Sequence, residues 1–445
     1  MVKLMATYTV RPAKETPGGY RCLSDCDQVK PVTHAPIIYF YPPVNMSLES
    51  ATEILRHSLS EALVIFYPLA GRLHWIGGGR LVLECNALGA LLIAVESDAK
   101  IDDFGDFRPT QEIRALIPSV DYNKPIHELP LVLVQVTKFS CGGISLGLGT
   151  SHIMTDGLSA LPFIQEWAKI ARGEQPNCPP FLDRSILLAP EHLTAPVFDH
   201  PEYSPQPLLI GKQDHMEERK RELEKLKDKA NKDRSASDNK NPYTRYEAVA
   251  GHIWRTACKA RQHESQQPTM LSIAVDARNR MKPPLPPRYF GNAIFRITAE
   301  STSGELVSKS LGYASGKARQ AIEKATHEYF QSSLAYVKCL EDVTQFRSFH
   351  TVGCAKGAFY GNPNLEVTSW ARLPLYGVDF GWGQEIYMGP GALGFDGKVF
   401  VLPSRGQDGS FLVVLRLQVR HIDAFQKFFY EDIFRQKPLS INPSL

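Results

Sequence analysis

The sequence predicts an α/β protein in which two halves of similar size each contain mixed sheets. Strand-like and helix-like segments follow one another in both halves of the 445-residue chain, a pattern typical of α/β proteins. A chain of this length normally forms two or three domains. One highly charged segment, residues 211–242, separates the halves. We therefore expect an N-terminal lobe over residues 1–210 and a C-terminal lobe over residues 243–445.

The N-terminal half carries five clear element signals. β-Branched and aromatic side chains predict a strand over residues 35–41. Apolar residues at helical spacing predict a helix over residues 50–63. Residues 131–139 and 143–149 predict two strands joined by a Cys-Gly-Gly turn, and residues 158–171 predict a helix that ends before a glycine.

The C-terminal half repeats this mixture. Helical periodicity and β-branched runs predict a helix over residues 245–260, a strand over 271–275, mainly helix over 311–340, strands over 367–373, 399–401 and 411–419, and a last helix over 421–429.

The segment between the halves is a charged linker. Residues 211–242 contain 10 Lys/Arg and 8 Asp/Glu and almost no large apolar side chains. Pairs of opposite charge four residues apart predict a solvated helix over residues 216–229. Residues 233–242 are polar enough to predict a disordered loop.

Composition excludes several classes of protein. Hydrophobic residues make up 43% and charged residues 22%, as in an average soluble globular protein. A formal net charge of +3 is too balanced for a dedicated nucleic-acid binder, and no apolar run is long enough for a membrane helix. The eight cysteines are scattered without a zinc pattern, so we expect no metal site, free thiols and a cytoplasmic protein.

Two short motifs carry chemistry. His152 leaves a predicted strand, and Asp156 stands four positions later before a predicted helix. A histidine held at a strand end suits a general base. The second motif is Asp-Phe-Gly-Trp-Gly at residues 379–383, in which Trp382 offers an indole N–H donor. Each motif alone is a weak signal.

Together the motifs resemble the plant acyl-CoA-dependent acyltransferases known as the BAHD family, which pair HxxxD with a C-terminal DFGWG. The resemblance runs from end to end and includes residues 67–73, 251–255, 276–278 and 289–292. It implies two lobes of the chloramphenicol-acetyltransferase-like fold, with mixed sheets and a channel between them. It also implies a monomer without a cofactor, in which acyl-CoA is a co-substrate and the other partner is a small molecule.

The resemblance assigns catalytic roles. His152 would take the proton from the acceptor, with no covalent enzyme intermediate. Asp156 would orient its loop through Arg278. In such a site the oxyanion needs hydrogen-bond donors, for which the Thr368 hydroxyl and the Trp382 indole are the candidates. Asp379 would lock the loop of the second motif.

The acceptor predicted from the sequence is spermidine, through an amine. The chain resembles spermidine hydroxycinnamoyl transferases, and residues 351–356 lack the arginine that grips the carboxylate of shikimate or quinate in other relatives. Strand alternation places Glu366 on the same face as Thr368 and Trp370, where Glu366 is a candidate to bind an ammonium group. O-Acylation of shikimate, quinate or another alcohol is the alternative.

The acyl group would lie against the start of the strand at residues 35–41. His34 and Tyr39 are candidates to bind its phenol, whereas Ile37 stands where relatives have a hydroxyl side chain. The strand that relatives carry before the linker helix is expected to be absent here. A third interpretation is therefore a chain that binds ligand without catalysis.

Overall fold

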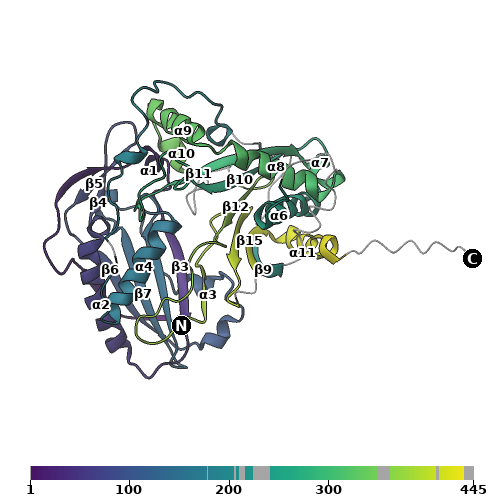
Figure 1. The fold of residues 1–445 in the computed structure, drawn as a ribbon. Coiled ribbons are helices and arrows are strands. Elements are labelled where there is room, and N and C mark those ends of the chain that lie inside the picture. The colour runs from purple at the N-terminus through teal and green to yellow at the C-terminus, as the bar shows by residue number, and fades with distance from the viewer. Residues whose placement is uncertain are drawn as a thin grey trace, which may run out of the picture.

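The computed structural model describes residues 2–177, 179–204, 207–209, 216–223, 241–348, 361–406 and 410–434. These residues form two large mixed sheets and one small sheet (Figure 1). The predicted α/β class with mixed sheets is confirmed. No helix in these ranges is long and apolar enough to cross a membrane.

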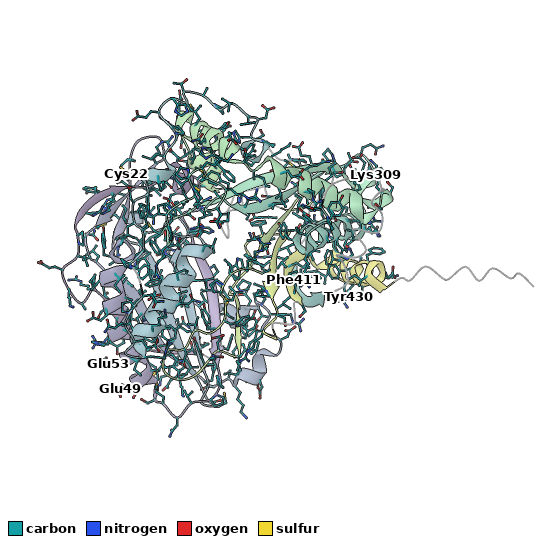
Figure 2. All side chains as sticks on the ribbon, in the orientation of Figure 1. Cys22, Glu49, Glu53, Lys309, Phe411 and Tyr430 are labelled. Atoms are coloured by element: carbon teal, nitrogen blue, oxygen red, sulfur yellow. The ribbon has the colours of Figure 1, made fainter. Side chains whose placement is uncertain are left out.

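The first large sheet belongs mainly to the N-terminal half. Its strands, in spatial order, are β1 (Val2–Val10), β6 (Ala90–Ser97), β7 (Val132–Phe139), β8 (Ile144–Ser151), β3 (His34–Tyr41) and β13 (Tyr387–Pro390). The helices α2 (Leu48–Ile65) and α4 (Gly157–Ala171) bury their apolar stripes on this side of the molecule (Figure 1). The opposite, solvent-facing side of α2 carries Glu49 and Glu53 (Figure 2).

The second large sheet is built from the C-terminal half. Its strands, in spatial order, are β11 (Ile294–Thr302), β10 (Pro268–Asp276), β12 (Leu365–Ser369), β14 (Lys398–Pro403), β15 (Phe411–Gln418) and β9 (Met216–Leu223). Next to it lie α6 (Arg245–Arg261), α8 (Leu311–Lys324) and α11 (Val419–Phe434) (Figure 1).

The remaining elements are short or peripheral. The small sheet has the order β2 (Gly19–Cys22), β5 (Leu81–Cys85) and β4 (Arg72–Trp75). The other α-helices are α1 (Asp25–Gln28), α3 (Gln111–Arg114), α7 (Ser303–Ser308), α9 (His327–Cys339) and α10 (Thr344–Ser348); the 3₁₀ turns span Tyr67–Ala70, Ile101–Phe104, Ile126–Glu128, Ser185–Leu187 and Pro201–Tyr203.

Three expectations about organisation differ from the structure. Met216–Leu223 forms the edge strand β9, paired antiparallel with β15, where the charge pattern predicted a helix. The expectation that no strand precedes the linker helix is therefore wrong as well. Pairing with an existing sheet edge overrides a local helix preference, and charged residues are common on edge strands. The rest of residues 211–240 lies outside the described ranges. The strand expected over residues 367–373 ends at Ser369.

The C-terminal half also contributes to the first sheet. Strand β13 pairs antiparallel with β3, so that Pro390 stands opposite Ile37. Val378, Phe380 and Trp382 belong to the apolar core of the first lobe. A boundary at the charged linker therefore separates most, but not all, of the residues that pack together.

The two halves are joined by a buried carboxylate. Asp27 on α1 accepts hydrogen bonds from the backbone N and Nδ2 of Asn292, at 3.0 and 2.8 Å. Arg184 Nη1 lies 3.0 Å from Asp27 Oδ2. Asn292 Nδ2 also donates to the carbonyl of His152 at 3.0 Å. Because Asp27 is fully buried, its charge is compatible with folding only while these partners stay in place.

We predict that Asp27→Ala lowers the free energy of unfolding by about 3–5 kcal/mol, because the change leaves the buried Arg184 without its carboxylate. Asp106→Ala is the control, since Asp106 pairs with Arg108 at the surface and its loss costs less than about 1 kcal/mol. Urea denaturation followed by circular dichroism measures both. Equal effects of the two changes would contradict the structural role of Asp27.

Candidate active site

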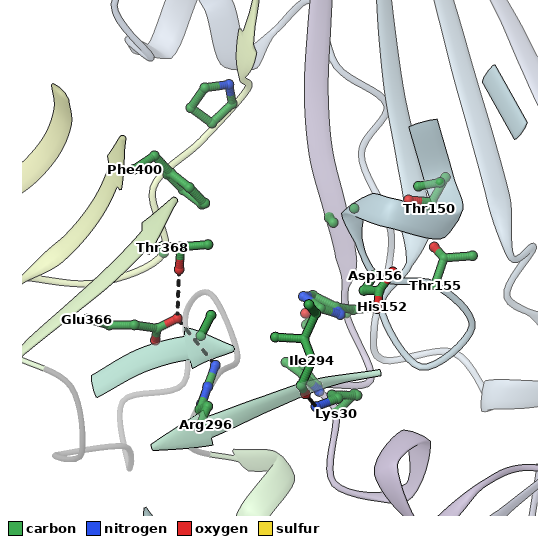
Figure 3. A pocket seen from close by; sticks show the side chains of 18 of the residues that line it. Lys30, Thr150, His152, Thr155, Asp156, Ile294, Arg296, Glu366, Thr368 and Phe400 are labelled. Carbon is green, nitrogen blue, oxygen red and sulfur yellow. Dashed lines mark hydrogen bonds and ion pairs between the residues drawn. The ribbon is translucent and has the colours of Figure 1, made fainter. Parts of the chain in front are cut away.

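A cavity of about 270 Å³ lies between the two halves. One wall comes from the first sheet and the segments beside it, including His34, Ile37 and His152, and the other comes from the second sheet. Figure 3 shows His152 on one side and Thr368 with Glu366 on the other. The cavity therefore brings together side chains that lie more than 200 positions apart in the sequence.

His152 is held by its backbone at the end of β8. Its N–H donates to the carbonyl of Thr33 at 2.9 Å, and its carbonyl accepts from Asn292. Burial, together with the positive charges of Lys30, Arg296 and Lys398, lowers the pKa of His152 to about 4. The imidazole is therefore neutral near pH 7, which is the state in which it can accept a proton.

Asp156 holds the loop that carries His152. Arg278 Nη1 and Nη2 donate to Asp156 Oδ2 and Oδ1, both at 2.9 Å, in a bidentate pair. Asp156 Oδ1 also accepts from Ser159 N at 3.0 Å and thereby caps the start of α4. Its oxygens face Arg278, Ser159 and Ala293 rather than the His152 ring. This is the arrangement that the resemblance implied.

A row of charged side chains crosses the opposite wall. Glu366 on β12 stands directly opposite Lys398 on β14 in the parallel register, and Lys398 Nζ donates to Glu366 Oε1. Arg296 Nη2 on β11 lies 3.4 Å from the same oxygen. Burial alone would raise the pKa of Glu366, but Arg296 and Lys398 lower it to about 2. Glu366 is therefore an ionised carboxylate whose charge is already met by two cations of the protein.

Thr368 faces the cavity within this row. Its Oγ1 donates to Glu366 at 3.3 Å and accepts from Lys398 Nζ at 3.0 Å. Trp370, just past the end of β12, also lines the cavity and packs against Phe400. Glu366, Thr368 and Trp370 thus all line the cavity, although only the first two lie on the strand.

Trp382 and Asp379 lie apart from the cavity lining. Trp382 is buried among the aromatic side chains of the first lobe, against Tyr41 and Phe380, and its indole N–H has no hydrogen-bond partner among the described residues. Asp379 Oδ1 accepts from Gly381 N at 2.7 Å and from Gly383 N at 2.9 Å, which closes the loop on itself. We therefore do not assign Trp382 an oxyanion role.

The three residues expected near the phenol of the acyl group do not all line the cavity. Ile37 lines the cavity, whereas Tyr39 is buried in the first core. His34 also lines the cavity, but its Nε2 pairs with Pro130 O at 2.8 Å and its Nδ1 with the Tyr122 hydroxyl at 3.1 Å. Both ring nitrogens of His34 are thus engaged by the protein.

The sequence did not predict three cations that line the cavity: Lys30, Arg296 and Lys398. Each stands alone in its stretch of sequence, without a motif. Strand pairing alone brings Arg296 and Lys398 to Glu366. A correct prediction of the strand order would therefore have placed both cations at the site. The arginine-free stretch 351–356 lies outside the described residues.

Comparisons with known proteins identify the family of this chain. The model of the family described as "Transferase family" matches residues 1–432. A hydroxycinnamoyl-CoA:piscidic acid hydroxycinnamoyltransferase of Actaea racemosa is 48% identical over 97% of this chain and 100% of its own length. A shikimate O-hydroxycinnamoyltransferase of Nicotiana tabacum is 41% identical over 97% of this chain and 99% of its own length.

The fold has solved counterparts as well. The crystal structure of vinorine synthase superposes with a TM-score of 0.73 at 23% identity and covers 95% of this chain and 96% of that one. The chain therefore belongs to the transferase family that contains the BAHD acyltransferases, and it is an acyl-CoA-dependent acyltransferase with the two-lobed BAHD fold.

We predict that His152→Ala lowers kcat by about 10²–10⁴-fold, the usual contribution of a general base. In the wild type, kcat/KM with an alcohol acceptor should be flat above about pH 5 and fall near pH 4, because protonation removes the base. Steady-state assays, with circular dichroism to verify folding at each pH, measure this. His57→Ala, an exposed histidine on α2, is the control. A rate that follows a pKa near 6.5 would contradict the neutral, desolvated base.

Proposed function

We propose that this acyltransferase transfers a hydroxycinnamoyl group from its coenzyme A thioester to a hydroxyl group of a carboxylic acid. The observation that carries the proposal is the positive charge around His152, to which Lys30, Arg296 and Lys398 all contribute. An acceptor that bears a carboxylate next to the reacting hydroxyl gains from these charges. The names of two relatives, which refer to piscidic acid and shikimate, support the same class of acceptor.

The polyamine acceptor expected from the sequence has weaker support. That expectation relied on Glu366 as a partner for an ammonium group. Glu366 already pairs with Lys398 and Arg296, so a polyamine would have to displace a buried ion pair. It would also approach three cations of its own sign. The O-acyltransfer alternative therefore agrees better with the cavity.

The described side chains suggest a complete proton path. His152 removes the proton of the acceptor hydroxyl as its oxygen attacks the thioester carbonyl and forms the new C–O bond. The carbonyl oxygen becomes an oxyanion, which hydrogen-bond donors stabilise in a site shielded from water. The C–S bond then breaks, and His152 returns the proton to the departing thiolate.

Donors for the oxyanion stand on the wall opposite His152. Lys398 donates to Thr368 Oγ1, so the Thr368 hydroxyl proton can turn from Glu366 to the oxyanion while its oxygen keeps a partner. An ammonium has three donors, of which Glu366 and Thr368 engage two. Thr368 therefore stays a candidate donor, and Lys398 takes the place of Trp382 beside it.

In a competition assay we expect esters of hydroxy acids and no spermidine amides. The purified protein is given coumaroyl-, caffeoyl-, feruloyl- and cinnamoyl-CoA with shikimate, quinate, malate, spermidine and spermine together, and mass spectrometry identifies the products. The cationic cavity should favour acids over polyamines by at least about 10-fold in kcat/KM. Amides formed in preference to esters would contradict the proposal.

The dependence of the rate on alkaline pH separates the two chemistries further. A polyamine must lose a proton before it attacks, so its acylation rate should rise between about pH 7 and 9. A hydroxyl group needs no such step, and His152 is already neutral in this range. We therefore expect kcat to change less than about twofold from pH 7 to 9. A tenfold rise per pH unit would indicate an amine acceptor.

A further inference from the structure

Lys30 is a cation of the cavity that the catalytic steps above leave without a task. It follows the short helix α1 and lines the cavity on the same side as His152 (Figure 3). Its Nζ donates to the carbonyl of Ile294 at 2.6 Å and lies beside the buried thiol of Cys26. An ammonium group has three donors, so at least one remains for a ligand.

Within the described part of the chain, no carboxylate lies within ion-pair distance of Lys30. The three carboxylates that line the cavity besides Glu366 each have another partner: Asp25 pairs with Arg80 and accepts from Ala189 N, Asp156 pairs with Arg278, and Glu202 accepts from Tyr329 and contacts His200. A partly buried cation beside a neutral base costs free energy unless an anion joins it. The missing anion can come from the substrate.

Among the described side chains, the charged row on the opposite wall has its own excess of one positive charge. Arg296 and Lys398 contribute two positive charges and Glu366 contributes one negative charge. On β10, Ala274 stands opposite Arg296 and Ser272 stands opposite Glu366, so the Arg296 side chain reaches Glu366 diagonally across a strand whose side chains here are small. The cavity thus has two separate cationic points, Lys30 and this row.

Both points lie close to the base. Lys30, Arg296 and Lys398 each act on the charge of His152. In Figure 3 Lys30 lies near His152, whereas Arg296 lies on the other side of the cavity and points toward Glu366. Lys30 is fixed against β11 by its bond to Ile294, two residues before Arg296 on the same strand face. An acceptor that places its hydroxyl at His152 therefore has one cationic point on the His152 wall and the other on the opposite wall of the cavity.

We propose that the acceptor is a hydroxy acid with two carboxylates, one bound by Lys30 and the other by the Arg296–Glu366–Lys398 row. This inference rests on the proposed function and narrows its acceptor to a dianion. Lys30 is then a specificity-determining residue for the acceptor and has no part in binding coenzyme A.

The test compares malate with 2-hydroxybutyrate and 3-hydroxybutyrate, which keep the four-carbon skeleton and replace one carboxylate with a methyl group. Each is measured as an inhibitor that competes with the acceptor found in the competition assay. Malate should bind at least about 10-fold more tightly than either monocarboxylate, because a hydrogen bond to a charged partner is worth at least that factor.

Lys30→Met should remove this advantage, so that malate loses about 10-fold and binds no better than the stronger monocarboxylate. Lys30→Arg should retain most of the advantage, since it keeps the charge. The KM for acyl-CoA should stay within about twofold in both variants. Lys14→Met, an exposed lysine near the N-terminus, is the matched control, and thermal unfolding shows that each variant is folded.

Two results would overturn the inference. One is equal inhibition by malate and the monocarboxylates in the wild type. The other is a Lys30→Met variant whose acyl-CoA KM rises while the binding of malate stays unchanged. Either result is compatible with the formation of hydroxy-acid esters, so it would contradict this inference and leave the proposed function intact. Failure of the proposed function shows separately, as spermidine amides in the competition assay.

Discussion

The Asp156 carboxylate is the interaction on which the site depends. Its two oxygens accept from Arg278, Ser159 and Ala293, which come from both halves of the chain. A buried carboxylate is tolerated only with such a full set of partners. Because these partners meet only when the halves are assembled, the loop that carries His152 takes its shape together with the fold. Asp27 joins the two halves in the same way, through hydrogen bonds of Asn292 to Asp27 and to the His152 carbonyl.

The electrostatics of the cavity follow from this assembly. A general base must be neutral before it can act, and burial among cations keeps His152 neutral. The same cations stabilise the negative charge that develops on the thioester oxygen and attract an anionic acceptor. One arrangement of charge therefore serves the base, the transition state and the choice of substrate. A cavity rich in unpaired carboxylates would raise the pKa of His152 and weaken all three.

Local patterns in the sequence predicted the parts of the structure that local physics determines. The strand at β3, the helices α2, α4 and α6, and the loop joining His152 to Asp156 all lie where periodicity and capping residues indicated. The charged row could not be predicted in this way, because it depends on the order β11-β10-β12-β14 and on the register that sets Glu366 beside Lys398. Strand order is a property of the whole sheet. For the same reason β9 was missed, since only its partner β15 makes those charged residues a strand.

Strand register reverses the type of substrate that Glu366 suggests. Judged from its strand face alone, an acid in the cavity suggests a cationic substrate. Once Lys398 stands opposite it and Arg296 reaches across β10, the same carboxylate holds two cations in place, and the three described side chains together keep one positive charge. Without Glu366, the two partly buried cations would repel each other and turn apart. Glu366 therefore makes a rigid, positively charged surface possible. A substrate meets the net charge of the Arg296–Glu366–Lys398 row and not the charge of Glu366 alone.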